Sequence, residues 1–222
     1  MKSKFVKAIC AALGLAIATA TPANETTPTE AGLLVGKATA QHKLIGWASY
    51  TCPHCAQFAA EGEPALALAY LPTGKLNYEI RPFIRNIVDI TASLAVSCGD
   101  PSKYLSNHSL MMGNQEVWMK KAQQASPAQT QRWGNGSFPE RMRAIAGDLD
   151  FYELMARNGY RQTDLDKCLA DEAKATKIAE RSRADAIAFD IKGTPSFALD
   201  GKLLDGAHSW AVVEERLNAA LN

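Results

Sequence analysis

The sequence predicts an α/β fold in which a block of helices interrupts a small sheet. Strand and helix patterns alternate up to residue 88, and a stretch with repeated helix starts and stops fills 89–170. From 171 onward the chain returns to a helix, two strands and a last helix. The order βαβ, helical insertion, αββα predicts an α/β domain made of 31–88 and 171–222, with an all-α domain inserted at 89–170.

The first part of the α/β domain carries strand patterns on both sides of one helix. The strands are apolar or alternating runs at 33–35, 44–50 and 75–84. The helix begins around Cys55, and Gly62 and Pro64 predict a kink or break in it.

Capping residues mark helix boundaries in the insertion. Segments 126–129 and 137–140 match the capping box, in which a serine is followed three residues later by Gln or Glu. Gly147 and Gly159 are typical of helix ends. The insertion also concentrates five methionines, Met111, Met112, Met119, Met142 and Met155. Their helical spacing favours a core role, and a groove for varied peptides is the alternative.

The returning part of the α/β domain begins with an alanine-rich helix at 171–190. Strand patterns follow at 193–199 and 202–204, and the Asp200-Gly201 pair between them is a hairpin turn signal. An amphipathic helix at 209–221 ends the chain.

The N-terminus has the pattern of a secretory signal peptide at 1–20. Basic residues precede an apolar run of 11 residues, Ala8 to Ala18, and a small-x-small exit ends at Ala20. The alternative, a retained membrane anchor, conflicts with the length of roughly 20 residues that a membrane-spanning helix needs. Residues 21–30 are polar and predict a flexible lead-in. We therefore expect export, with periplasmic localisation.

Composition narrows the function classes. An apolar fraction of 47% and a charged fraction of 21% are ordinary for a globular protein. Loss of 1–20 removes three lysines and no acid, so the formal charge moves from +1 to −2. Such a chain gives no electrostatic reason to bind nucleic acid.

Four cysteines remain after the signal, and an oxidising compartment allows disulfides. Cys98 and Cys168 lie near the two ends of the insertion. We expect them to form a structural disulfide that closes a loop of about 70 residues, worth about 4 kcal/mol in the chain-entropy model. Two buried free thiols are the alternative.

The other two cysteines form the motif Cys52-Pro53-His54-Cys55 at a strand-to-helix turn. Free N–H groups and the helix dipole at a helix N-terminus favour a thiolate, and a partly cationic His54 adds to this. We predict Cys52 as the exposed nucleophile and Cys55, one turn further in, as the more buried resolving residue. Pro53 and His54 between the cysteines argue for oxidation over reduction. A half zinc site and a static disulfide are the alternatives, although no second CxxC or His pair completes four ligands.

A CxxC motif follows a strand, Gly193-Thr194-Pro195 precedes a later strand, and a hairpin and a terminal helix come last. In the order of these features the chain resembles a thioredoxin fold. With the CPHC sequence, the helical insertion and the signal peptide, the chain resembles the DsbA family of periplasmic thiol:disulfide oxidoreductases. The resemblance implies that Pro195 is cis and that Thr194 beside it faces the cysteines. A trans proline at a strand start is the alternative. Gly46 departs from the family, because many members carry a buried glutamate at this position.

We therefore predict a periplasmic thiol:disulfide oxidoreductase that acts mainly as an oxidase, with no cofactor and no metal. The expected partners are reduced or unfolded exported proteins and, by resemblance, a membrane redox partner for reoxidation. A monomer is expected, because few residues precede the first strands. A disulfide isomerase or reductase and a peptide-binding holdase are the alternatives. His42, His108 and His208 show no acid-base partner in the sequence and are interpreted as surface or capping residues.

Overall fold

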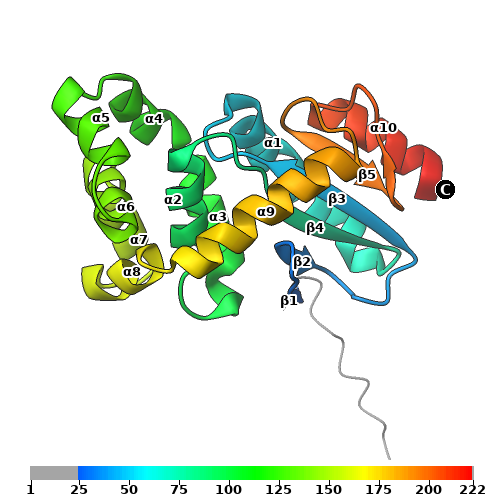
Figure 1. The fold of residues 1–222 in the computed structure, drawn as a ribbon. Helices are drawn as coiled ribbons and strands as arrows, with labels where there is room; N and C mark the ends of the chain where they lie inside the picture. Colours follow the sequence, from blue (N-terminus) through cyan, green and yellow to red (C-terminus); the bar gives the residue numbers. More distant parts are fainter. Residues whose placement is uncertain (1–24, 222) are drawn as a thin grey trace, which may run out of the picture.

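The computed structural model describes residues 25–221 and shows a six-stranded sheet beside a separate block of helices (Figure 1). The predicted signal peptide and 21–24 lie outside the described residues. The strand order is β1-β2-β4-β3-β5-β6, and only the β3–β4 pair is parallel. The strands are β1 (Thr26–Pro28), β2 (Leu33–Val35), β3 (His42–Ala48), β4 (Leu76–Pro82), β5 (Ser196–Leu199) and β6 (Lys202–Leu203). The predicted α/β fold class is confirmed.

The two central strands are buried along most of their length, as their apolar content requires. Leu44 and Trp47 of β3 are fully buried, as are Leu76 and Ile80 of β4. Parallel strands need a crossover connection, and the helix α1 (Pro53–Ala65) supplies it here. The loops after β3 and β4 therefore lie at the same edge of the sheet.

The lead-in predicted at 21–30 is wrong in its described part. Thr26–Pro28 forms β1, which pairs antiparallel with β2. The segment has no apolar period because β1 is a short edge strand with little burial, so its polar side chains stay in contact with solvent.

The helix break predicted at Gly62 and Pro64 does not occur, because α1 runs through both residues. A Cβ on Gly62 would lie 2.7 Å from the Phe58 ring and 2.9 Å from Trp210, so glycine at this position allows aromatic packing. The irregularity comes just after Pro64, where the chain continues as a π-helical segment (Leu66–Tyr70) and a 3₁₀ turn (Leu71–Thr73).

Helices cover both faces of the sheet. On one face α1 packs with α10 (Trp210–Leu221), and the Phe58 ring lies between Phe197 and Trp210. The other face is crossed by the long helix α9 (Glu172–Ala188), drawn in gold in Figure 1. The predicted hairpin between β5 and β6 forms, with positive φ at Asp200 and Gly201.

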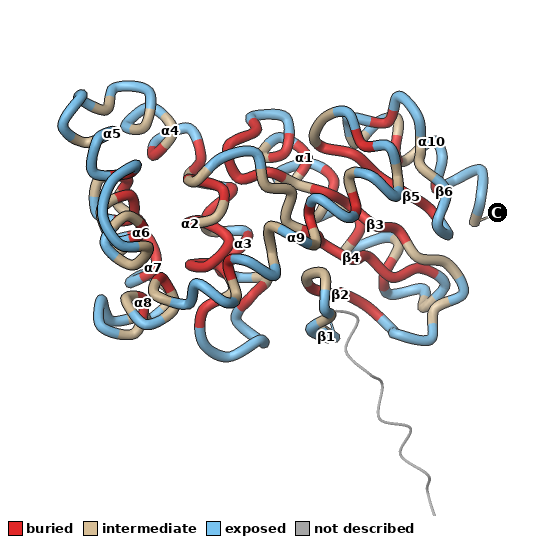
Figure 2. The backbone as a smooth tube through the Cα atoms, in the orientation of Figure 1, coloured by how far each residue is buried: buried red, intermediate tan, exposed pale blue. Residues whose placement is uncertain are grey.

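The insertion is a group of short helices along which buried and exposed stretches alternate (Figure 2). Its helices are α2 (Ile87–Val96), α3 (Tyr104–Gly113), α4 (Gln115–Gln123), α5 (Pro127–Gly134), α6 (Phe138–Asp148), α7 (Phe151–Ala156) and α8 (Gln162–Leu169), with a 3₁₀ turn at Pro101–Lys103. Both predicted capping boxes are present, at the starts of α5 and α6. Gly159 has positive φ after α7, whereas Gly147 lies inside α6 and Asp150 takes the left-handed turn. Among residues 25–221, no helix has the length and apolar content that a membrane crossing requires.

Candidate active site

The CPHC motif lies where β3 meets α1, at the sheet edge shared with the end of β4 and the loop before β5. Cys52 is the N-cap residue of α1, with extended backbone at φ −103° and ψ 116°, and Pro53 occupies the first turn. Proline is well suited there, because its missing N–H would have no partner in a helix start. The sequence thus places the first cysteine at the positive end of a helix.

The two cysteines are free thiols with opposite tendencies to ionise. Hydrogen bonding from the Cys55 thiol lowers the pKa of Cys52 to about 4, against the opposing effect of burial, and the Thr194 side chain and the backbone N–H groups of Cys55 and His54 add to the lowering. Burial raises the pKa of Cys55 far above that of an ordinary thiol. A thiolate at Cys52 beside a neutral thiol at Cys55 is the result.

The prediction that Cys52 is exposed is wrong, whereas the deeper position predicted for Cys55 agrees with burial being the largest influence on its pKa. Cys52 exposes 3% of its surface and Cys55 exposes 2%. The two thiols differ instead in what sets their pKa values. Several hydrogen-bond donors around the Cys52 sulfur lower its pKa, whereas burial is the largest influence on the pKa of Cys55 and raises it. Of the residues between them, His54 is exposed at the surface.

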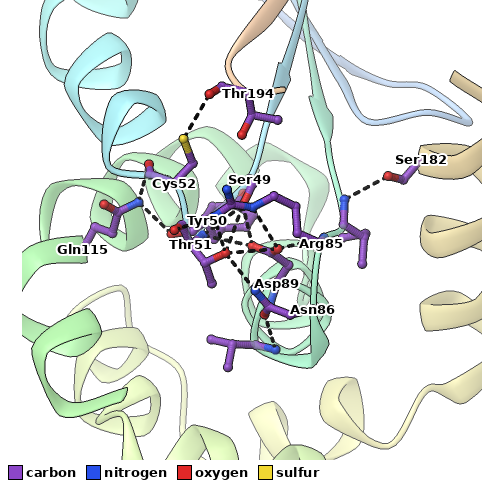
Figure 3. Close-up of polar contacts among 12 residues, drawn as sticks. Ser49, Tyr50, Thr51, Cys52, Arg85, Asn86, Asp89, Gln115, Ser182 and Thr194 are labelled. Carbon is purple, nitrogen blue, oxygen red and sulfur yellow. Dashed lines mark hydrogen bonds and ion pairs between the residues drawn. The ribbon is translucent and has the colours of Figure 1, made fainter. Parts of the chain in front are cut away.

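The loop before β5 contacts the first cysteine. The Thr194–Pro195 peptide bond is cis, and the Cys52 thiol donates to Thr194 O at 3.1 Å (Figure 3). On the outer side, His208 Nδ1 donates to Pro195 O at 2.7 Å. The structure thus brings Cys52 together with Thr194 and Pro195, which follow it by more than 140 positions in the sequence.

Gly46 leaves space for an aromatic residue beneath the site. A Cβ at this position would lie 2.6 Å from the Tyr78 hydroxyl oxygen and 3.1 Å from the Phe197 ring. No larger side chain fits there, so a carboxylate at position 46 is excluded by packing. Burial raises the pKa of Tyr78 well above its usual value, so its phenol stays protonated.

A polar cluster fixes the segment just before Cys52 (Figure 3). Asp89, fully buried in the first turn of α2, accepts hydrogen bonds from Ser49 Oγ at 2.9 Å and from the Thr51 backbone N–H at 2.9 Å. The second carboxylate oxygen accepts from the Thr51 hydroxyl at 3.2 Å and from the Arg85 backbone N–H at 2.9 Å. The Arg85 guanidinium and the Asn86 side chain donate to the Thr51 hydroxyl in turn. We call Ser49, Thr51, Arg85, Asn86 and Asp89 the Asp89 cluster.

A second residue of the insertion holds the same segment from another side. Gln115, at the start of α4, donates through its side-chain amide to Tyr50 O at 2.7 Å and to Cys52 O at 2.8 Å. It is 4% exposed, so these bonds satisfy a buried amide.

The interpretation of His108 as a surface or capping residue is wrong. Its ring is 1% exposed and lies 2.9 Å from the Tyr50 hydroxyl and 3.0 Å from Glu63 Oε1. These two partners come from segments 45 and 58 positions away in the chain, so no local pattern around His108 predicts them. His42 pairs with Asp200 near the hairpin, away from the cysteines.

Cys98 and Cys168 are joined by a disulfide, with S–S 2.03 Å and Cα–Cα 5.5 Å. The bond links the end of α2 to α8 and lies in the insertion. Residues 25–221 contain no group of three or more His, Cys, Asp or Glu side chains that could hold a metal ion.

Comparison with known proteins identifies the family. A family model described as Thioredoxin matches residues 28–219. The chain belongs to the thioredoxin family. A crystal structure of a protein-disulfide isomerase from Novosphingobium aromaticivorans is 40% identical with a TM-score of 0.82, covering 85% of this chain and 96% of that one. The fold is also that of α-DsbA1 from Wolbachia pipientis, with a TM-score of 0.65, 19% identity, and coverage of 84% and 88% of the two chains.

Relatives in Rickettsia are more distant. A protein from Rickettsia prowazekii named as a protein-disulfide oxidoreductase is 28% identical over 71% of this chain. The aligned part is 50% of that protein, so this thioredoxin-family chain spans about half the length of the relative.

Sequence reasoning placed the cysteines and the Thr194–Pro195 loop, but it missed Asp89, Arg85, Gln115 and Tyr78. Asp89 follows Asn86 by three residues, which by itself indicates only a helix start. Each of these residues acts on a segment distant in sequence, and no local spacing pattern reports such a contact.

Proposed function

We propose that this protein is an exported thiol:disulfide oxidoreductase that acts mainly as an oxidase. The observation that carries the proposal is the position of Cys52 at the N-terminus of α1, against the Thr194–Pro195 loop, where neighbouring donors lower its pKa to about 4. Near neutral pH, Cys52 in the reduced pair is a thiolate stabilised by the site. An environment that stabilises the reduced form makes the Cys52–Cys55 disulfide easier to give away.

In the oxidase direction, a substrate thiolate attacks Cys52 Sγ and breaks the Cys52–Cys55 bond. Cys55 leaves and takes up a proton, as its raised pKa favours. A mixed disulfide between Cys52 and the substrate results. A second substrate thiolate then attacks the substrate sulfur and releases Cys52 as a stable thiolate, so two electrons pass from the substrate to the cysteine pair.

The surroundings of the site suit a polypeptide substrate. A groove of about 700 Å³ begins at Pro53 and runs between α1 and α4, with Met112 and Met119 in its wall. Met111, Met142 and Met155 are fully buried, so most of the methionines have the core role. The proposed substrates are reduced exported proteins, and reoxidation is assigned to a membrane redox partner.

Isomerase activity is the second candidate, because the 40% identical Novosphingobium protein is described as a protein-disulfide isomerase. In that role the Cys52 thiolate of the reduced form attacks a substrate disulfide and exchanges it for another. The thiolate is available for this reaction at neutral pH as well.

The deciding experiment is the redox equilibrium of residues 21–222 against glutathione, followed by alkylation and mass. We expect a potential well above the thioredoxin value of about −270 mV. A potential at or below that value would reject the oxidase proposal. Parallel assays with reduced and with scrambled ribonuclease separate the two candidates: an oxidase acts on the reduced substrate, and an isomerase restores activity to the scrambled one.

A further inference from the structure

The segment from Ser49 to Cys52 connects the central strand of the sheet to the reactive cysteine. It is held by hydrogen bonds to residues outside the CPHC motif, Asp89 and Gln115. Asp89 receives two of its hydrogen bonds from Ser49 Oγ and the Thr51 N–H, both at 2.9 Å, across about 40 residues of sequence. An aspartate in the first turn of a helix needs no such partners, because free backbone N–H groups are already nearby.

We propose that Asp89 is a positioning residue for the cysteine pair, whose carboxylate fixes the Ser49–Thr51 segment and thereby places Cys52 at the N-terminus of α1. The inference rests on the proposed function, because it concerns the reactivity of the same pair.

Burial makes the hydrogen bonds of Asp89 rigid. The carboxylate is 0% exposed, and Ser49 is 0% exposed as well. A buried anion without partners is strongly unfavourable, so the segment cannot move away without leaving Asp89 unsatisfied. The Arg85 guanidinium closes the cluster by donating to Thr51 O at 2.6 Å. The cluster therefore locks together the loops that follow β3 and β4.

The fixed segment contacts both sulfur-bearing residues. Ser49 O accepts from the Cys52 backbone N–H at 3.2 Å, and the Ser49 backbone N–H helps to offset the effect of burial on the pKa of Cys55. Gln115 fixes the Tyr50 and Cys52 carbonyls from the side of α4. The orientation of the Cys52 sulfur toward Thr194 and the helix N–H groups thus depends on where Ser49 and Thr51 are held.

A positioning role of Asp89 and a direct effect of its charge would change the pKa of Cys52 in opposite directions. Arg85 faces Asp89 from the same loop, the Glu63–His108 pair lies behind Tyr50, and Glu116 and Lys120 line the groove beside Pro53. A negative charge at position 89 would by itself oppose a thiolate at Cys52. Removal of that charge by itself would lower the pKa of Cys52, whereas loss of positioning raises it.

The test uses two variants of residues 21–222 and one control. Asp89→Asn removes the carboxylate, and Thr51→Val removes the hydroxyl at the other side of the cluster while leaving the charge in place. Asp185→Asn is the control, because Asp185 is also buried, at 2% exposed, and its partners are Trp47, Arg81 and Arg181 rather than residues 49–52. The readouts are the pH midpoint of Cys52 alkylation in the reduced protein and the equilibrium with glutathione.

We expect both variants to raise the alkylation midpoint by about one pH unit and to make the disulfide about tenfold less oxidising. The control loses stability to urea but keeps the wild-type midpoint. An unchanged or lowered midpoint in Asp89→Asn overturns the proposal, and Thr51→Val decides the question if Asp89→Asn does not fold. A wild-type protein without an acidic Cys52 would instead reject the proposed function, before any variant is compared.

Discussion

Two cysteine pairs in one chain follow different physical rules. Cys52 and Cys55 are three residues apart, free, and divided by their surroundings into an acidic thiol and a strongly basic one. Cys98 and Cys168 are separated by 70 residues and form a disulfide within the packed helices of the insertion. The first pair owes its chemistry to a helix terminus and a neighbouring loop, and the second owes its role to the length of chain that it closes. The first cysteine of each pair, Cys52 or Cys98, is almost fully buried. Burial alone therefore does not distinguish a reactive cysteine from a structural one.

The largest expected effect comes from removing the first sulfur of the reactive pair. Cys52→Ala should abolish oxidation of a reduced substrate, because no other sulfur can form the mixed disulfide. Loss of free thiols from reduced ribonuclease mixed with the oxidised protein measures this. The matched control is the double variant Cys98→Ala, Cys168→Ala, which should keep the activity. Oxidation retained in Cys52→Ala would reject Cys52 as the reacting sulfur.

The second effect concerns stability. The double variant without the Cys98–Cys168 disulfide should lose about 4 kcal/mol of unfolding free energy, because the unfolded chain regains the entropy of a loop of about 70 residues. Urea unfolding of the oxidised protein measures the loss. The alkylation midpoint of Cys52 should not move, and a clear shift would mean that the two pairs are coupled.

A third effect, at most equal in size to the second, follows from pH. The pKa of Cys52 is about 4 when folded, below the ordinary thiol value, so its ionisation stabilises the folded reduced protein. That contribution is complete above the unfolded pKa of about 8.5 and is lost as pH falls toward 4. The stability of the reduced protein relative to the oxidised one should therefore fall from pH 8 to pH 4, by up to about 1 kcal/mol per pH unit once solvent screening is allowed for. Paired thermal unfolding curves of the two redox forms measure it, and a constant difference would contradict the low pKa.

The smallest expected effect is at the loop facing Cys52. Thr194→Val removes the buried hydroxyl but keeps the carbonyl that accepts from the thiol. Because the Thr194 side chain is a secondary cause of the low pKa, behind the Cys55 thiol, the alkylation midpoint should rise by about half a unit. Ser196→Ala is the control: Ser196 is the first residue of β5, its hydroxyl donates to Gly193 O, and the midpoint should stay in place.

Prediction from the sequence was accurate where a local pattern determines structure. The capping boxes, the Asp200-Gly201 turn and the strand before Cys52 all formed, because each depends on residues within a few positions. It was wrong where packing overrode the local preference. Gly62 continues a helix because two aromatic rings press against it, and His108 is buried because Glu63 and Tyr50 satisfy both ring nitrogens.

The sequence by itself determined the fold class, the place of the insertion and the presence of a cysteine at a helix N-terminus. These follow from hydrophobic period, turn residues and helix capping, which are properties of short segments. Only the tertiary structure decided which groups surround that cysteine. Thr194, Asp89 and Gln115 reach residues 49–52 from segments 38 to 142 positions away in the chain, and the ionisation of a thiol depends on the atoms nearest in space.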